Sequence, residues 1–152
     1  MPTAQVPETL DSRPGTYALV LECRDEKRIR IGRIGTLNMR PGFYIYVGSA
    51  LGPGGLAGRV LRHARRSKRR RWHVDYLTAA TSLVEVWLAR GPQRLECQWA
   101  RAAGRLPGAE VPLKGFGSSD CRCRSHLFFF AARPSWERFA RNLKEAVPGP
   151  AP

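Results

Sequence analysis

The sequence feature that most constrains the fold is the run FYIYV at residues 43–47, which contains only aromatic and β-branched residues. Such residues favour strands, because their side chains pack well on a pleated, half-buried surface. The run ends at Gly48 and is followed by the glycine-rich turn LGPGG, after which Leu56, Val60 and His63 recur at helical spacing. The sequence therefore predicts a strand, a tight turn and an amphipathic helix in direct succession.

The chain as a whole is predicted to have strands first, and then strands and helices interleaved. Helices are predicted at residues 55–71, 73–80, 94–104 and 135–146, and further strands at 17–23, 28–31, 83–89 and 126–132. The first two strands flank the charged turn RDEK and are expected to form a hairpin, and Ser135 is expected to cap the last helix. Because no strand–helix–strand unit repeats, we expect an α+β fold with a small, mainly antiparallel sheet flanked by helices.

The ends of the chain differ in composition from its middle. Residues 1–13 and 147–152 are polar or proline-rich and lack periodicity, so both are expected to be flexible, which leaves one domain at residues 14–146. No apolar run is long enough for a signal peptide or a membrane span, so we expect a cytoplasmic protein. Cysteines in that compartment remain thiols, available for metal binding, chemistry or core packing.

Positive charge is abundant and segregated. The chain has 26 Lys and Arg against 12 Asp and Glu, and 13 of the bases lie in residues 27–74, which contain no acid. Like charges repel along a helix, and a phosphate backbone would relieve that repulsion. We therefore expect a nucleic-acid partner, although a merely solvated basic surface remains the alternative. The expected contacts are Arg62, Arg65, Arg66, Lys68, Arg69, Arg70 and Arg71.

Several short motifs resemble the GIY-YIG nuclease superfamily. They are GTY at residues 15–17 and YVG at 46–48, followed by Ser49, Ala50, Arg59, His63, Glu96 and Trp99. The resemblance covers roughly residues 15–131 and extends to a small branch that is also found fused to endonuclease III type repair enzymes. That branch is matched by FYIYVGSALGPGGL, RWHVDYL, LECQWA and GFGSSDCRCRSHLFFF. Residues 18–45 form a longer spacer between the two tyrosines than most members have, so an extra hairpin is expected there.

The resemblance implies a GIY-YIG-like fold and an endonuclease that hydrolyses DNA phosphodiester bonds with one Mg²⁺ or Mn²⁺ ion, in DNA repair or processing. By this resemblance, Tyr17 or Tyr46 would orient or deprotonate the attacking water. Arg59 would hold the scissile phosphate, and Glu96 would carry the metal. His63 would donate to a phosphate or assist the tyrosine. A phenol has a pKa near 10 and is therefore a poor base at neutral pH. We expect the surrounding arginines to lower that pKa.

Further residues near these motifs are candidates for lining the site, namely Ser49, His73, Ser119 and Asp120. Several candidates could have structural roles instead: Glu96 could pair with Arg94 or Arg101, and His73 and Asp75 could cap a helix. Strand tyrosines also commonly pack in cores. The rival function is a non-catalytic module that keeps the nuclease fold and binds DNA or RNA, with DNA preferred as the partner.

Four potential ligands for a soft metal are Cys97, Cys121, Cys123 and His126. Their chemistry suits structural zinc, but such sites prefer pairs with the spacing Cys-x₂₋₄-Cys, and here the pair is Cys-x-Cys. We therefore expect thiols that fill a small core, with zinc as the less favoured alternative.

Overall fold

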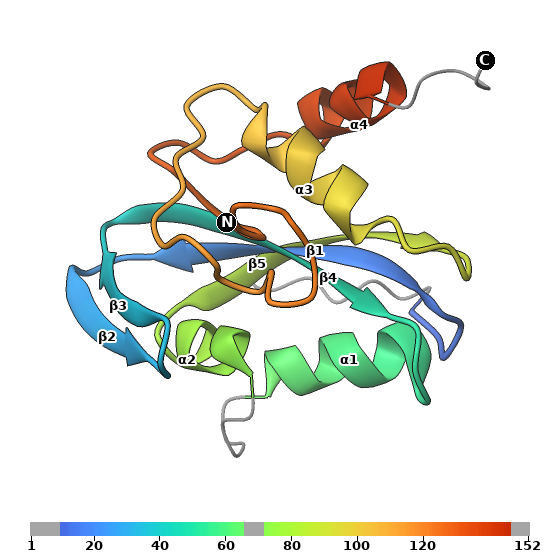
Figure 1. Ribbon diagram of the computed structural model, residues 1–152, viewed down its shortest axis with the longest axis horizontal. Coiled ribbons are helices and arrows are strands. Elements are labelled where there is room, and N and C mark those ends of the chain that lie inside the picture. The colour runs from blue at the N-terminus through green and yellow to red at the C-terminus, as the bar shows by residue number, and fades with distance from the viewer. Residues whose placement is uncertain (1–9, 66–71, 147–152) are drawn as a thin grey trace.

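The computed structural model describes residues 10–65 and 72–146 of the protein, with the backbone alone at 145 and 146. Its centre is a four-stranded antiparallel sheet with the strand order β5-β1-β4-β6 (Figure 1). The strands of this sheet are β1 (Gly15–Cys23), β4 (Gly42–Ala50), β5 (Ser82–Arg90) and β6 (Leu127–Phe130). The predicted α+β fold with a small antiparallel sheet is confirmed.

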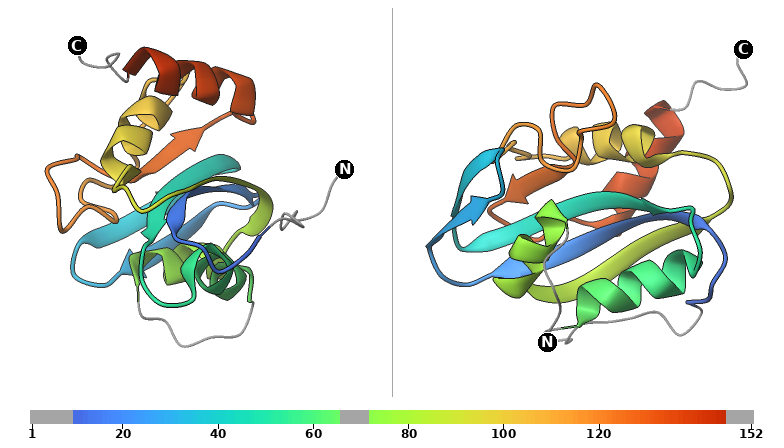
Figure 2. Two further views of the ribbon diagram at one scale, coloured as in Figure 1. Left: turned by 90° about the vertical axis from the view of Figure 1, so that its right-hand side faces the viewer. Right: turned by 60° about the horizontal axis from the view of Figure 1, so that its bottom comes forward.

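Helices cover both faces of the sheet, two on each face (Figures 1 and 2). One face carries α1 (Gly55–Ala64) and α2 (His73–Ala79), and the other carries α3 (Glu96–Gly104) and α4 (Trp136–Ala146). Successive side chains of a strand point to opposite faces, so the central strand β1 contributes to two cores. Leu19 and Leu21 pack toward α1 and α2, whereas Ala18 and Val20 pack toward α3 and α4.

A second, two-stranded sheet lies between β1 and β4 in the sequence. It consists of β2 (Lys27–Ile31) and β3 (Gly35–Met39), so the extra hairpin predicted between the two motif tyrosines is confirmed. The predicted pairing of the first two strands is wrong, because β1 pairs with β4 and β5 while β2 pairs with β3. Strand β1 is nine residues long and almost fully buried, so it requires long partners on both sides, which the five-residue, mostly exposed β2 does not provide.

The predicted helices are present, although the first is shorter than expected. Helix α1 ends at Ala64, because Arg65 already has an extended backbone, and the residues 66–71 of the prediction lie outside the described residues. The last helix begins as predicted, since the backbone N–H of Arg138 donates to Ser135 Oγ at 3.1 Å. In the part of the chain that the structure describes, no helix has the length and apolar character needed to cross a membrane.

The segment before β1 contacts the start of α1. The backbone N–H groups of Leu56 and Ala57, at the start of α1, donate to the carbonyl oxygens of Arg13 and Asp11. The first N–H groups of a helix have no partner within the helix, and Gly54 at the N-cap offers no side chain. Residues 11–13 therefore cap α1 and hold it against the sheet.

Candidate functional site

A pocket of about 240 Å³ opens beside α1, on the face of the sheet that α1 and α2 cover. Its lining comes from two strands, from α1, from the start of α2 and from the loop before β6. The lining residues are Tyr17, Tyr46, Arg59, His63, Trp72, His73, Gly117 and Ser119. The structure thus brings together the four residues expected to be catalytic, together with two of the expected lining residues, His73 and Ser119.

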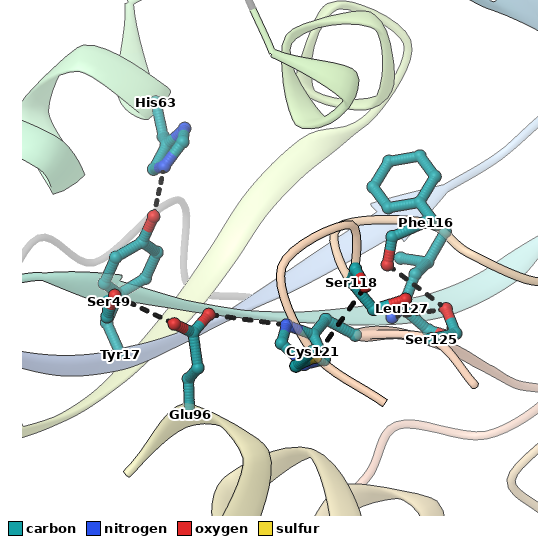
Figure 3. Close-up of polar contacts among 10 residues, drawn as sticks. Tyr17, Ser49, His63, Glu96, Phe116, Ser118, Cys121, Ser125 and Leu127 are labelled. Carbon is teal, nitrogen blue, oxygen red and sulfur yellow. Dashed lines mark hydrogen bonds and ion pairs between the residues drawn. The ribbon is translucent and has the colours of Figure 1, made fainter. Parts of the chain in front are cut away.

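Tyr17 and His63, which both line this pocket, are in direct contact. The hydroxyl oxygen of Tyr17 on β1 lies 2.7 Å from Nε2 of His63 on α1, which is hydrogen-bond distance, and both side chains are buried (Figure 3). His63 faces the sheet because it lies on the same face of α1 as the buried Leu56 and Val60. The apolar spacing of α1 therefore places an imidazole against the phenol of the first motif.

Gly48 allows the two tyrosines to approach each other. It lies opposite Tyr17 in the register of β1 and β4, and the rings of Tyr17 and Tyr46 are 6.5 Å apart. A Cβ atom at Gly48 would lie 2.5 Å from the hydroxyl oxygen of Tyr17 and 3.1 Å from the Tyr46 ring. The glycine of the second motif is therefore required by packing at the site itself.

Burial raises the pKa of both pocket tyrosines. For Tyr17 and for Tyr46 the largest effect is the loss of hydration of the charged phenolate, and the negative charge of Glu96 adds to it. The positive charge of Arg59 lowers both pKa values, but its effect is smaller than that of burial. The expectation that arginines lower the phenol pKa overall is therefore wrong, and both hydroxyl groups are neutral at physiological pH.

Two arginines of α1 stack on the ring of Trp72, and they have different roles. The guanidinium carbons of Arg59 and Arg62 lie 4.5 and 4.1 Å from the centre of the indole ring. Arg59 lines the pocket, whereas Arg62 donates from both terminal nitrogens to the buried carboxylate of Asp75, at 2.6 and 2.9 Å. Asp75 also accepts from the backbone N–H of Trp72 and so caps α2, which is the structural role that the sequence suggested for it. This pairing gives Arg62 a structural role.

Glu96, the expected metal ligand, is the first residue of α3 and lies close enough for its charge to act on both phenols. Ser49 Oγ donates to its Oε1 at 3.1 Å (Figure 3), and Nδ1 of His126 lies 3.4 Å from its Oε2. The partner of Glu96 is thus His126, and Arg94 contributes only a weaker electrostatic effect. His126 lowers the pKa of the Glu96 carboxyl against the opposing effect of burial, so the carboxylate is ionised.

The four candidate soft ligands converge on the other side of Glu96. The ligand atoms of Cys97, Cys121, Cys123 and His126 all lie within 4.8 Å of one another, so this cluster can hold a metal ion. The three thiols are half-buried and form no disulfide, whereas His126 is buried. The expectation of thiols that only fill a core does not account for this convergence.

Comparison with known proteins assigns the chain to a family. The family described as "Domain of unknown function DUF123" matches residues 16–148 of the 152. The chain belongs to this family. No curated protein and no solved structure matches the chain. From Thr16 onward the match covers the strands of the central sheet, the pocket and the thiol cluster, so all of them belong to the DUF123 domain.

Not every predicted site residue of the DUF123 domain reaches the pocket. Ser49 contacts Glu96 instead, and Asp120 is exposed outside the lining. Arg65 is exposed at the end of α1, and the remaining expected phosphate contacts, Arg66, Lys68, Arg69, Arg70 and Arg71, lie outside the described residues. The sequence analysis did not identify Trp72 and Gly117 as lining residues. Trp72 could have been found from its position between a basic run and the start of a helix, and Gly117 from its position in a glycine-rich turn.

Proposed function

We propose that this DUF123 domain is a metal-dependent endonuclease that hydrolyses phosphodiester bonds of DNA. The observation that carries the proposal is the convergence of Tyr17, Tyr46, Arg59 and His63 on one pocket. These residues come from β1, β4 and α1, and the resemblance to GIY-YIG nucleases assigns all four to one reaction. The formal net charge of +14 supports a polyanionic substrate.

In the proposed reaction, Tyr17 and His63 act as a pair that removes a proton from the attacking water. The phenol oxygen of Tyr17 accepts this proton while its own proton passes to Nε2 of His63, 2.7 Å away. This relay avoids a free phenolate, which burial disfavours. The water oxygen then bonds to phosphorus, the bond from phosphorus to the leaving oxygen breaks, and the leaving oxygen takes a proton from solvent.

Arg59 and Tyr46 complete the protein's part in the reaction. The guanidinium of Arg59 faces the pocket and is held against Trp72, so it can donate to phosphoryl oxygens without a large rearrangement. The hydroxyl of Tyr46 lies in the same lining and orients the attacking water or the phosphate. Positive charge placed before the reaction begins stabilises the charge that develops on the phosphoryl group.

Glu96 is the residue that we propose to bind Mg²⁺ or Mn²⁺. Its carboxylate is ionised and half-buried, and its charge acts on both phenols although it does not line the pocket, which fits a hard cation that takes one or two carboxylates together with water and substrate phosphate. When bound, the ion stabilises the negative charge of the leaving oxygen. Ser49 holds one oxygen of this carboxylate in place.

Purified protein is expected to nick or cut DNA in the presence of Mg²⁺ or Mn²⁺, and EDTA is expected to stop it. The assay should include double-stranded, single-stranded and branched DNA, together with an RNA of matched sequence. Tyr17→Phe should remove cleavage while leaving binding nearly unchanged, because the phenol contributes to proton transfer rather than to affinity. Binding without cleavage on every substrate would contradict the nuclease proposal and favour a non-catalytic binding module, and a preference for RNA would change the proposed substrate.

Replacing Arg65, Arg66, Arg69 and Arg70 by glutamine is expected to flatten the salt dependence of DNA binding. Each phosphate that a protein neutralises on duplex DNA contributes about 0.9 to the slope of log affinity against log salt, so four lost contacts reduce the slope by about 3 to 4. The measurement is a salt titration by fluorescence anisotropy. A matched control removes four exposed arginines of the α3 and α4 side, Arg101, Arg105, Arg138 and Arg141. Equal slopes for the two variants would exclude the basic segment at residues 65–71 as the contact surface.

A further inference from the structure

The thiol cluster beside Glu96 is a candidate metal centre in its own right. We propose that Cys97, Cys121, Cys123 and His126 bind one structural zinc ion, and that the bound His126 positions the carboxylate of Glu96. The proposal does not depend on the proposed nuclease reaction, because it rests on the ligand cluster alone. Three thiolates and one imidazole form a ligand set of the kind that structural zinc sites use.

The geometry of the cluster fits a tetrahedral site. All four ligand atoms lie within 4.8 Å of one another, and Sγ of Cys121 is 3.4 Å from Nε2 of His126. With bonds of about 2.3 Å to sulfur and about 2.0 Å to nitrogen, a sulfur and a nitrogen in a tetrahedral zinc site are about 3.5 Å apart. This pair is therefore already at the separation that a tetrahedral zinc ion requires.

The Cys-x-Cys spacing does not prevent this arrangement, because the ligands come from two separate elements. Cys97 is in the first turn of α3, whereas the other three lie in the loop that leads into β6. The loop is anchored by backbone hydrogen bonds from Gly115 to the Arg124 carbonyl and from His126 to the Phe116 carbonyl, at 2.7 and 2.8 Å. A zinc ion would therefore cross-link this loop to α3.

The two nitrogens of the His126 ring have different partners, which fixes the orientation of the imidazole. Nε2 faces the thiols, while Nδ1 lies 3.4 Å from Oε2 of Glu96. Histidine ligands of zinc commonly present their other nitrogen to a carboxylate, which fixes the tautomer and the ring orientation. Glu96 in turn accepts from Ser49 on β4. The chain of contacts thus runs from the zinc ligands through Glu96 to the strand that carries Tyr46.

A core-filling role and a disulfide both agree less well with the structure of the thiol cluster. Cys23 shows what a thiol that fills the core looks like here, since it is 2% exposed and belongs to a hydrophobic core. The thiols of the cluster are half-buried instead, and Cys97 and Cys123 line a groove through which a metal ion can enter. A disulfide would use two of the four side chains and would leave the convergence of the remaining two without a cause. Thiolate ligands favour zinc over Mg²⁺ and Ca²⁺.

Metal analysis of the protein purified under reducing conditions tests the proposal, with about one zinc ion expected per chain. Cys121→Ser is expected to reduce the zinc content severely, and Cys23→Ser, the matched control, is expected to leave it unchanged. Replacing zinc by Co²⁺ should produce the visible absorption of tetrahedral cobalt and a thiolate charge-transfer band. A strong chelator should lower the melting temperature, because the metal's binding free energy is part of the folding free energy.

The proposed contact between zinc-bound His126 and Glu96 has a readout that is independent of cleavage. Glu96→Gln is expected to weaken zinc affinity by about 10- to 100-fold, the usual effect of losing the carboxylate partner of a zinc-bound histidine. The control is Glu85→Gln. It changes a carboxylate on β5 that pairs with Arg133, and it should leave zinc affinity unchanged. Unaltered zinc affinity in Glu96→Gln would refute the proposed coupling between Glu96 and zinc-bound His126.

Several results would overturn the zinc site itself. They are wild-type protein without zinc that also gives no tetrahedral Co²⁺ spectrum, a stable disulfide among the cluster thiols, or an unchanged zinc content in Cys121→Ser. If Cys121→Ser does not fold, the cobalt spectrum and the chelator experiment on the wild-type protein decide the question.

Discussion

Arg59→Ala is expected to lower the rate of DNA cleavage by about 10²- to 10³-fold, which is the usual effect of removing one preorganised donor to developing negative charge. The expectation follows from the position of Arg59 in the pocket, where it lies with Tyr17 and His63 and is held against Trp72. DNA affinity should fall by much less, because one phosphate contact among many contributes little to binding. Single-turnover cleavage and equilibrium binding, measured on the same DNA, separate the two effects.

Controls for this variant distinguish a catalytic arginine from a general loss of positive charge. Arg141→Ala removes the same charge from an exposed position on α4, on the opposite face of the sheet, and should leave the cleavage rate unchanged. Arg59→Lys keeps the charge but loses the planar, forked donors, so it should recover only part of the rate. Equal cleavage rates for Arg59→Ala and Arg141→Ala would show that Arg59 has no specific role at the scissile phosphate.

The sequence predicts most of the pocket residues, because local sequence patterns determine the strand and the helix that carry them. An aromatic and β-branched run forms β4 and brings Tyr46 and Gly48 to the sheet, and the apolar spacing of α1 turns His63 toward β1. Short-range rules of this kind need no knowledge of the tertiary fold. The resemblance to a known motif then selects which of these residues belong together.

The environment of the site depends on contacts between distant residues, which short-range rules do not contain. Glu96 and His126 are thirty positions apart in the sequence, and no spacing rule joins them. The loss of hydration that raises the pKa of Tyr17 and Tyr46 likewise depends on how α1 and the loop before β6 cover the sheet. A basic composition indicated the opposite shift, because composition does not reveal burial.

Strand pairing and the convergence of the metal ligands also depend on contacts between distant residues, which short-range rules do not predict. The turn RDEK suggested a hairpin of adjacent strands, but β1 takes the long partners β4 and β5, which pair with both of its edges. The Cys-x-Cys spacing argued against a metal site, but the fourth ligand comes from α3, which tertiary packing brings to the loop. In both cases the deciding partner lies far away in the sequence.

Asp75→Ala is expected to destabilise the protein by about 3 to 5 kcal/mol, the usual cost of breaking a buried ion pair by removing one partner. The carboxylate of Asp75 is fully buried and accepts from both terminal nitrogens of Arg62, whose side chain is 14% exposed. The substitution leaves a mostly buried guanidinium without this carboxylate and also removes the acceptor for the backbone N–H of Trp72. Urea denaturation at constant zinc concentration measures the loss.

The chain offers a closely matched control for the role of burial. Glu110 pairs with Arg40 at the same 2.6 Å as the Asp75 pair, but both side chains of this pair are about half exposed. Solvent screens such pairs, so Glu110→Ala should cost less than about 1 kcal/mol. Asp75→Asn keeps an oxygen for the Trp72 N–H while removing the charge, so nearly full recovery in that variant would assign the effect to helix capping. Similar losses in the two alanine variants would show that burial does not determine the strength of this pair.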